Sequence, residues 1–192
     1  VIFLDSFSDA GEGGTGILAR AVRAAMTVAE PHLRRRDRVG LVAFGGTLRW
    51  LEPGSGAVQR YRLIDALLET QVFFSYAWKD VNVIPARTLP PKALVVAITP
   101  LLDPRAVGAL LDLAARGFDL AVIEIPGDAY ASRPSDPIDE LAWRLWLLQR
   151  EELRAKLVAM GVAVSRWDED APLDVVLEGV RTYRRHARLV RH

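Results

Sequence analysis

Two carboxylates and two hydroxyls follow the first apolar run of the chain. Asp5, Ser6, Ser8 and Asp9 come directly after Val1–Leu4. Carboxylate and hydroxyl oxygens are the ligands that Mg²⁺ prefers, and open α/β sheets bind ligands where their parallel strands end. If Val1–Leu4 is such a strand, Asp5, Ser8 and Asp9 are the residues that would hold a divalent metal ion.

The same loop contains a glycine motif that matches the G-x-G-x-x-G pattern of dinucleotide-binding loops, Gly11-Glu12-Gly13-Gly14-Thr15-Gly16. In such sites the motif follows its strand almost at once, and an acidic residue ends the second strand. Here six residues separate Leu4 from Gly11, and Phe44-Gly45-Gly46 stands where the acidic residue is expected. The pattern favours a flexible glycine loop that leads into a helix.

Enzymatic chemistry at Asp5 has little support in the sequence. An aspartyl phosphotransfer site needs a second Asp two residues later as acid and base beside Mg²⁺, and that position holds Phe7. No histidine stands near a Ser or Asp motif that would suggest a triad. We therefore expect a protein that is not an enzyme. The alternative is a divalent-metal-dependent ligand receptor or hydrolase acting through Asp5 and Asp9.

The loop after the first strand also resembles a known family. Asp5-Ser6-Phe7-Ser8-Asp9 is similar to the Asp-x-Ser-x-Ser motif of the metal-ion-dependent adhesion site in von Willebrand factor A domains. Nearly the whole chain resembles one bacterial group in that superfamily, domain of unknown function 58. The segments that carry this resemblance are 1–5, 36–45, 89–96, 142–145, 151–157 and 161–162.

This sequence departs from the family pattern at several metal-ligand positions. Phe7 and Asp9 stand where the motif has serines, and Thr99-Pro100 stands where the family has Ser/Thr-Asp. The Thr-Asp of the family's second loop has no clear equivalent near 76–82, where Asp80 is the nearest carboxylate. Neither a Phe ring nor a Pro can ligate Mg²⁺, so we expect a degenerate site and no bound cofactor. Asp5 and Thr99 are instead expected to hydrogen-bond loop amides at the strand ends.

The resemblance implies a setting as well as a fold. Members of the group are usually membrane-anchored and often encoded beside MoxR-type AAA+ ATPases. It therefore implies a protein-interaction module at the cytoplasmic face of a membrane, with such an ATPase as a possible partner in assembly or maturation. Because the sequence opens inside a strand, we expect 1–192 to be one domain of a longer chain whose N-terminal region carries the anchor.

Composition limits the classes of partner. The 192 residues have a net charge of +1 and no cysteine, which excludes disulfides and thiolate metal sites. A charge this close to zero produces no global field that would attract nucleic acid or anionic lipid. No run reaches the ~18 apolar residues of a membrane span. The basic residues of 181–192 are interpreted as a solvated helix end, so neither nucleic acid nor membrane contact is expected of this segment.

Short apolar runs alternating with helical periodicity predict a doubly wound, mostly parallel α/β sheet, Rossmann-like and of von Willebrand factor A type. One short antiparallel edge strand is expected after Gly45-Gly46. The predicted strands are 1–4, 39–44, 47–51, 93–98, 120–125 and 162–164. The predicted helices are 17–35, with Thr15 as N-cap, and 58–68, 104–115, 137–160 and 173–188.

The irregular stretch 71–92 is the candidate interaction surface. It would border the old metal-binding edge, and aromatic side chains supply many of the binding hot spots of protein interfaces. The residues singled out are Phe73, Phe74, Tyr76, Trp78 and Asp80. Trp143, Trp146 and Leu147 have helical spacing, which predicts a core or inter-domain face.

Overall fold

The computed structural model describes residues 1–11, 15–72, 88–91, 93–168 and 171–178. Its strands are β1 (Ile2–Ser6), β2 (Val39–Gly45), β3 (Leu48–Gly54), β4 (Leu94–Thr99), β5 (Asp119–Glu124) and β6 (Ala163–Arg166). Its helices are α1 (Ile17–Arg34), α2 (Gly56–Leu68), α3 (Pro104–Ala115) and α4 (Pro137–Ala159), with a 3-10 turn, η3 (Gly127–Tyr130). Residues 173–178 are also helical.

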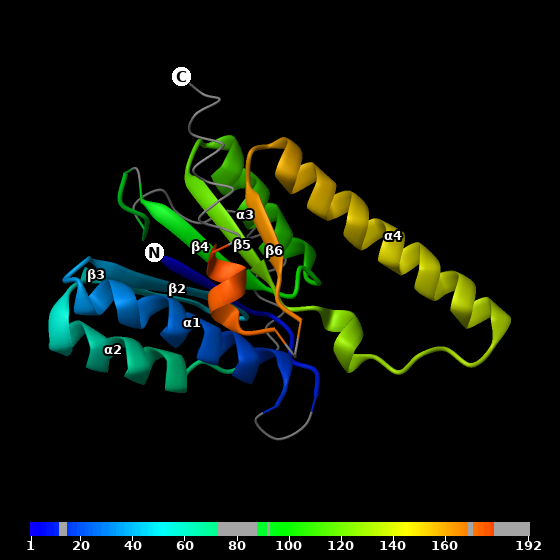
Figure 1. Cartoon of the computed structure of the whole chain (residues 1–192), viewed down its shortest axis with the longest axis horizontal. Helices are drawn as coiled ribbons and strands as arrows, with labels where there is room; N and C mark the ends of the chain where they lie inside the picture. Colours follow the sequence, from blue (N-terminus) through cyan, green and yellow to red (C-terminus); the bar gives the residue numbers. More distant parts are fainter. Residues whose placement is uncertain (12–14, 73–87, 92, 169–170, 179–192) are drawn as a thin grey trace.

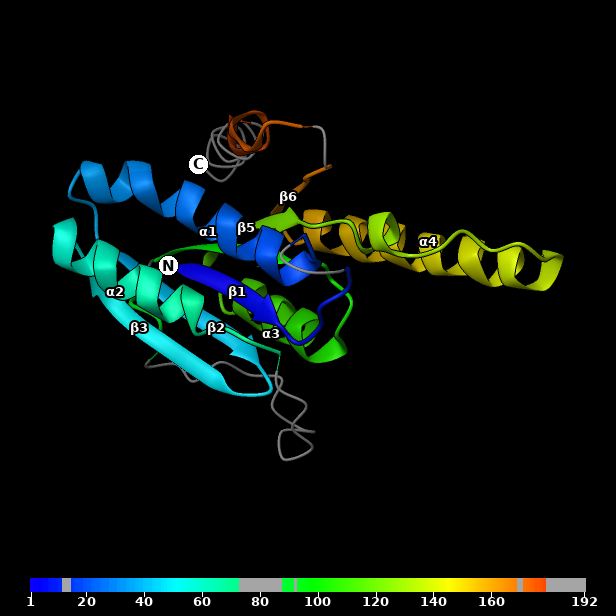
Figure 2. The same ribbon diagram turned by 90° about the horizontal axis from the view of Figure 1, so that it is seen from below.

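The six strands form one sheet in the order β3-β2-β1-β4-β5-β6. Every pairing is parallel except that of β2 with β3. This is the predicted doubly wound, Rossmann-like sheet with one antiparallel edge strand. Figures 1 and 2 show α1 and α2 together on one face of the sheet and α3 on the other.

The central strands are buried on both faces, as short continuous apolar runs predict. All five residues of β1 and all seven of β2 are buried. One core cluster joins β1 to α1 and α2 through Ile2, Leu4 and Leu63. A second joins the opposite face to α3 and the end of α4 through Phe3, Leu110 and Leu157.

Several predicted boundaries were wrong by a few residues. Strand β3 continues to Gly54 because an edge strand tolerates Pro53, whose ring removes only a backbone donor that no neighbouring strand needs. Helix α1 begins after Gly16, which carries no side-chain cap, so the prediction of Thr15 as N-cap was wrong. Between the predicted strand 120–125 and the predicted helix 137–160, residues Gly127–Tyr130 form η3. Of the predicted helix 173–188, residues 179–188 lie outside the described part.

Helix α4 has a different relation to the core from the other helices. Its C-terminal end packs on the same face of the sheet as α3, where Leu157 is the one fully buried residue of α4. The N-terminal half projects beyond the sheet (Figures 1 and 2). Trp143 and Trp146, predicted on a core or inter-domain face, are half-buried and stack on each other with ring centroids 5.1 Å apart. No helix in the described ranges is both long and apolar enough to cross a bilayer.

Candidate functional site

Two central strands bring Asp5 and Thr99 to the carboxyl edge of the sheet. Strand β1 pairs with β2 on one side and with β4 on the other, so the chain changes winding direction between β1 and β4. Ligand sites of open α/β sheets lie at such a switch point. Asp5 lies near the end of β1 and Thr99 ends β4.

The Asp5 carboxylate is engaged on both oxygens. Oδ1 accepts the Phe7 backbone N–H at 3.1 Å, and Oδ2 accepts the Thr99 hydroxyl at 2.6 Å. Thr99 Oγ1 in turn accepts the Leu101 N–H at 2.9 Å. Asp5 is 1% exposed, and this burial raises its pKa to about 6 although both hydrogen bonds act to lower it. The expectation that Asp5 and Thr99 hydrogen-bond loop amides is confirmed.

Phe7 fills the position where the family motif has its first serine. Its ring is buried edge-on against Phe44, with centroids 4.9 Å apart. The guanidinium carbon of Arg105 lies 4.0 Å from the centre of the same ring, a cation–π contact. Asp103 holds that guanidinium with two hydrogen bonds of 2.8 and 3.0 Å. A fixed cation and an aromatic ring therefore lie at this edge beside Asp5.

Asp9 and Ser8 have separate roles. Asp9 Oδ1 accepts the Leu18 N–H at 3.0 Å and so caps α1 from the preceding loop. Ser8 Oγ is buried and has no hydrogen-bond partner within the described part of the chain. Ile17 donates its N–H to the Ala10 carbonyl at 3.0 Å. Because these first-turn amides of α1 already have acceptors, they are not available to a phosphate group, which argues against the dinucleotide interpretation.

The predicted ligand residues do not form a metal centre. Within the described ranges, no three carboxylate or imidazole side chains lie together as a group that could hold a metal ion. Asp5 is turned inward to Thr99, Asp9 caps a helix and Pro100 offers no side-chain oxygen. In the described residues, Asp5 and Asp9 are thus engaged in hydrogen bonds with other parts of the fold. The predicted interaction residues Phe73, Phe74, Tyr76, Trp78 and Asp80 lie outside the described residues.

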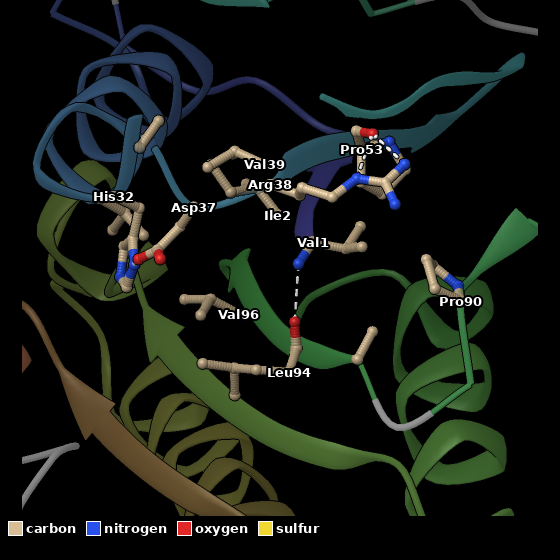
Figure 3. A pocket seen from close by; sticks show the side chains of 13 residues that line it. Val1, Ile2, His32, Asp37, Arg38, Val39, Pro53, Pro90, Leu94 and Val96 are labelled. Atoms are coloured by element: carbon tan, nitrogen blue, oxygen red, sulfur yellow. Dashed lines mark hydrogen bonds and ion pairs between the residues drawn. The ribbon is translucent and has the colours of Figure 1, made fainter. Parts of the chain in front are cut away.

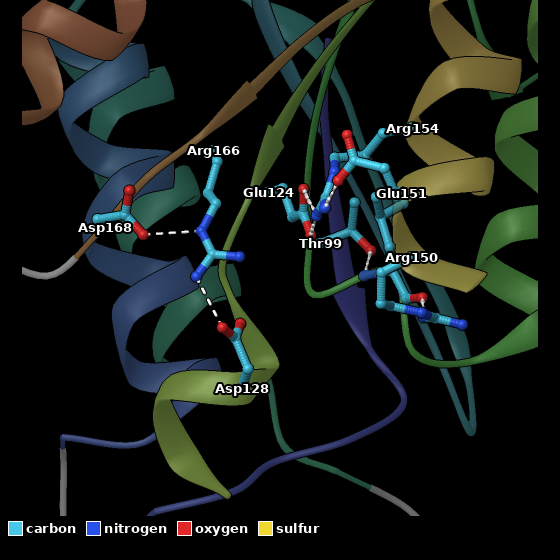
Figure 4. A network of polar contacts seen from close by, with 9 residues as sticks. Thr99, Glu124, Asp128, Arg150, Glu151, Arg154, Arg166 and Asp168 are labelled. Atoms are coloured by element: carbon cyan, nitrogen blue, oxygen red, sulfur yellow. Dashed lines mark hydrogen bonds and ion pairs between the residues drawn. The ribbon is translucent and has the colours of Figure 1, made fainter. Parts of the chain in front are cut away.

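A second polar cluster lies at the end of β5, and sequence reasoning missed it (Figure 4). Glu124 is 3% exposed and accepts two hydrogen bonds from Arg154 of α4, at 2.9 and 3.2 Å. Arg150, one turn earlier, donates to the Leu101 carbonyl. Leu101 has φ +55°, a left-handed conformation that the Thr99 hydroxyl and Arg150 hold from both sides. The available signal was an acidic strand end followed by two arginines four residues apart on one helix.

The same cluster continues to β6. Arg166 bonds Asp128 of η3 and Asp168, each at 2.8 Å. Among the residues drawn in Figure 4, the four carboxylates are paired with Arg154 or Arg166, whereas Arg150 donates to the Leu101 carbonyl. The cluster is therefore better suited to holding these elements in place than to binding a charged ligand.

A pocket of about 350 Å³ lies at the opposite, amino edge of the sheet (Figure 3). It is mainly apolar, and the starts of β1, β2 and β4 and the end of α1 surround it. Its polar wall includes His32, whose Nδ1 lies 2.8 Å from Oδ2 of Asp37. Sites in open α/β sheets use the carboxyl edge, so this pocket is separate from the candidate site. Its lining includes Val1, Ile2, Val28, Val39, Pro53, Pro90, Leu94 and Val96.

The described part is a doubly wound α/β domain in which no group of carboxylate or imidazole side chains is assembled for a metal ion. No protein-family model matches the chain, and no curated protein matches it. Two solved structures do. The conserved hypothetical protein BatB from Bacteroides thetaiotaomicron is 16% identical with a TM-score of 0.55, over 96% of this chain and 97% of that one.

The second structure is an aerotolerance-related membrane protein from Bacteroides fragilis, crystallised with multiple mutations to serines. It is also 16% identical with a TM-score of 0.55, over 94% of this chain and 97% of that one. At this identity the likeness concerns the fold alone. The predicted α/β architecture is thus matched along almost the full length of the chain.

Proposed function

We propose that this domain is a non-catalytic protein-interaction module of the von Willebrand factor A type, in the domain of unknown function 58 group. In this proposal the adhesion site has become a structural hydrogen-bond network. The observation that carries the proposal is the Asp5 carboxylate, which is buried and engaged on both oxygens by Phe7 and Thr99.

The residues that stand in place of the family's metal ligands support the proposed loss of metal binding. A divalent ion needs several oxygen donors, and each missing donor must be replaced by water. To bind Asp5, the ion would have to reach a buried carboxylate whose two oxygens each already accept a hydrogen bond, and it would lie near the cationic Arg105. Phe7 and Pro100 supply no oxygen from their side chains. The net result is a carboxyl edge that stabilises the fold instead of recruiting a ligand through a metal.

We infer the setting from the family resemblance. The proposed partner is a MoxR-type AAA+ ATPase, and the proposed place of action is the cytoplasmic face of a membrane. That one similar structure is described as an aerotolerance-related membrane protein supports the membrane setting. The test is a titration of the 192-residue chain with a MoxR-type AAA+ ATPase from the same organism. Saturable binding is expected with or without divalent ions, and a strict Mg²⁺ requirement would contradict the proposal.

The metal question has its own experiment. Isothermal calorimetry with Mg²⁺ and Mn²⁺ should give no saturable heat with the wild-type chain. The triple variant Phe7→Ser/Asp9→Ser/Pro100→Asp restores the family's oxygen donors at these three positions and should gain Mn²⁺ binding if it folds. Circular dichroism checks the fold of each variant. Tight binding by wild type that Asp5→Asn abolishes would overturn the proposal.

One observation favours the alternative, a metal-dependent ligand receptor or hydrolase acting through Asp5 and Asp9. Ser8 Oγ is buried without a hydrogen-bond partner among the described residues. It stands between Asp5 and Asp9 in the sequence, and an orphan oxygen there is one that a metal ion would satisfy. Under this alternative Ser8→Ala would lower metal affinity. Under the proposal it leaves the calorimetric baseline of wild type unchanged.

A further inference from the structure

The projecting half of α4 carries an exposed apolar stripe. Ile138 is 81% exposed, Leu141 60%, Leu145 53% and Leu148 65%. The gaps between them are three, four and three residues, which places the four side chains on one face of the helix. These four residues are called the outer stripe.

The outer stripe is not part of the core. None of its four residues belongs to the hydrophobic clusters formed by the described residues. The helix turns a different set of side chains inward, with Leu157 buried and Trp146, Leu147 and Leu153 half-buried. Surface leucines are ordinary when scattered, but a contiguous apolar row on a projecting helix is typical of an interaction site.

The helix does not need a partner in order to form. Asp136 caps it by accepting the N–H groups of Ile138 and Asp139 at 2.9 and 3.0 Å, and Pro137 occupies the first turn. Glu140 and Arg144 form an i,i+4 ion pair at 3.1 Å. The outer stripe is therefore presented on a preformed element, which reduces the entropy lost on binding.

We propose that the outer stripe is the interface between two copies of this chain, with their α4 helices packed antiparallel about a two-fold axis near residue 143. A two-fold interface requires a surface that is complementary to itself. The gap series of three, four and three is the same read from either end. In antiparallel packing, Ile138 therefore faces Leu148 of the second copy, and Leu141 faces Leu145 of the second copy. The spacing is that of the apolar positions along a coiled-coil interface.

The charges beside the outer stripe suit a second copy. One flank carries the uncharged Ala142 and Gln149. On the other flank, each Arg144 is paired with Glu140 of its own helix at 3.1 Å, so its charge is balanced within each copy. In antiparallel packing the two helix dipoles oppose each other favourably. An anionic lipid surface suits the helix less well, because its first turn holds Asp139 and Glu140, whereas surface-bound helices carry Lys and Arg. This inference rests on α4 alone and is independent of the proposed function.

Sedimentation equilibrium of the 192-residue chain tests the interface. Wild type should approach twice its 21.2 kDa mass with increasing concentration. Leu141→Glu/Leu145→Glu should weaken the dimer by roughly a hundredfold. The matched control, Val58→Glu/Leu68→Glu, adds the same charge on α2 at residues that are 65% and 73% exposed, and should leave the dimer unchanged. A monomeric wild type, or equal weakening by both double variants, overturns the proposal.

Cysteine cross-linking tests the direction of packing, since the chain has no cysteine of its own. Ile138→Cys and Leu148→Cys chains should form a disulfide when mixed and neither should when alone. The ten-residue separation is about 15 Å along a helix, and a disulfide needs Cα atoms within about 7 Å. Self-cross-linking of Leu148→Cys overturns the antiparallel arrangement. Binding of monomeric chain to phosphatidylglycerol vesicles, lost in Leu141→Glu/Leu145→Glu, overturns the choice of a second copy.

Discussion

The Asp5 carboxyl group has an unusual environment for a charged residue. It is 1% exposed, and desolvation raises its pKa to about 6, from an ordinary value of 3.8, against the effect of the hydrogen bonds from Thr99 and Phe7. The folded chain therefore binds a proton that the unfolded chain releases between these two pH values. The stability contributed by the protonated group is full below about pH 3.8 and is lost as the pH rises through about 6.

This difference predicts how Asp5→Asn changes with pH. The amide that replaces the Asp5 carboxyl group cannot ionise. The variant therefore avoids the loss of folding stability that the wild-type chain suffers when Asp5 ionises. Relative to wild type, its free energy of unfolding should improve by up to roughly 3 kcal/mol between about pH 4 and about pH 7.5. Urea denaturation at the two pH values measures the change. Asp65→Asn, which neutralises an exposed carboxylate on α2, controls for net charge. A pH-independent difference between wild type and Asp5→Asn would contradict the explanation by burial.

At the scale of elements, the first turn of α1 depends on a residue outside the helix. Gly16 stands at the N-cap without a side chain, and Asp9 reaches back to the Leu18 N–H at 3.0 Å. A Cβ at Gly16 would lie 2.6 Å from Asp9 Oδ1, so the glycine makes room for this cap. Asp9 therefore serves α1 as a cap in a loop where the motif suggested a metal ligand.

Removing the cap should weaken α1 measurably. Asp9→Ala leaves the Leu18 amide without its acceptor and should lower the free energy of unfolding by about 1 kcal/mol. For a chain of this size that corresponds to a fall in Tm of about 3 °C, measurable by differential scanning calorimetry. Asp9→Asn keeps an oxygen acceptor at the same place and should retain most of the stability. Equal losses in both variants would mean that the carboxylate charge, not the hydrogen bond, is what matters.

Helix α4 is attached to the sheet through charged as well as apolar contacts. Arg154 binds the buried Glu124, and Arg150 binds the Leu101 carbonyl. Burial raises the pKa of Glu124, and the Arg154 charge acts against that rise. The attachment of α4 to the sheet therefore depends on the Glu124 carboxylate, and Glu124 needs the nearby charge of Arg154 in order to stay ionised.

Breaking this pair should cost far more than breaking an exposed pair on the same helix. Arg154→Met leaves Glu124 buried without its cation, and we expect a loss of about 3 kcal/mol in chemical denaturation. The loss should be smaller at acid pH, where Glu124 is neutral, and adding Glu124→Gln should recover part of it. Arg144→Met breaks the exposed pair with Glu140 and should change stability by less than about 1 kcal/mol. Similar losses in Arg154→Met and Arg144→Met would contradict the role of burial.

At the scale of the whole molecule, the described part consists of a helix-covered sheet and a helix that extends past it (Figure 1). Cooperative stability follows buried apolar contacts. Strands β1 and β4 lie between the two core clusters, whereas residues 137–149 of α4 contain no fully buried residue. The two parts should therefore open with different free energies.

Native-state hydrogen exchange can measure that difference. In a dilute sample, amides of 141–149 should exchange through local opening, while those of β1 and β4 exchange only with global unfolding. The C-terminal turns of α4, held by Leu157 and Arg154, are the internal control and should be better protected. Uniform protection along α4 would contradict a weakly attached N-terminal half.

Much of the architecture was predictable because it depends on local pattern. Short apolar runs such as 39–44 and the helical periodicity of 17–35 identify a parallel sheet with its helices without reference to distant residues. The hydrogen bonds of Asp5 and Thr99 to nearby amides were predictable for the same reason, since donor and acceptor lie two residues apart.

Only the tertiary structure decided what these residues do together. The Asp5–Thr99 bond joins positions 94 residues apart, and Glu124 meets Arg154 across 30. Sequence determined that oxygen donors were missing from the motif, because Phe7 and Pro100 are visible in it. It did not determine that Asp9 caps α1 or that α4 leaves the sheet with leucines exposed. Those outcomes depend on how the helices and strands pack in three dimensions. A local sequence pattern carries no information about the distance between elements that are far apart in the chain.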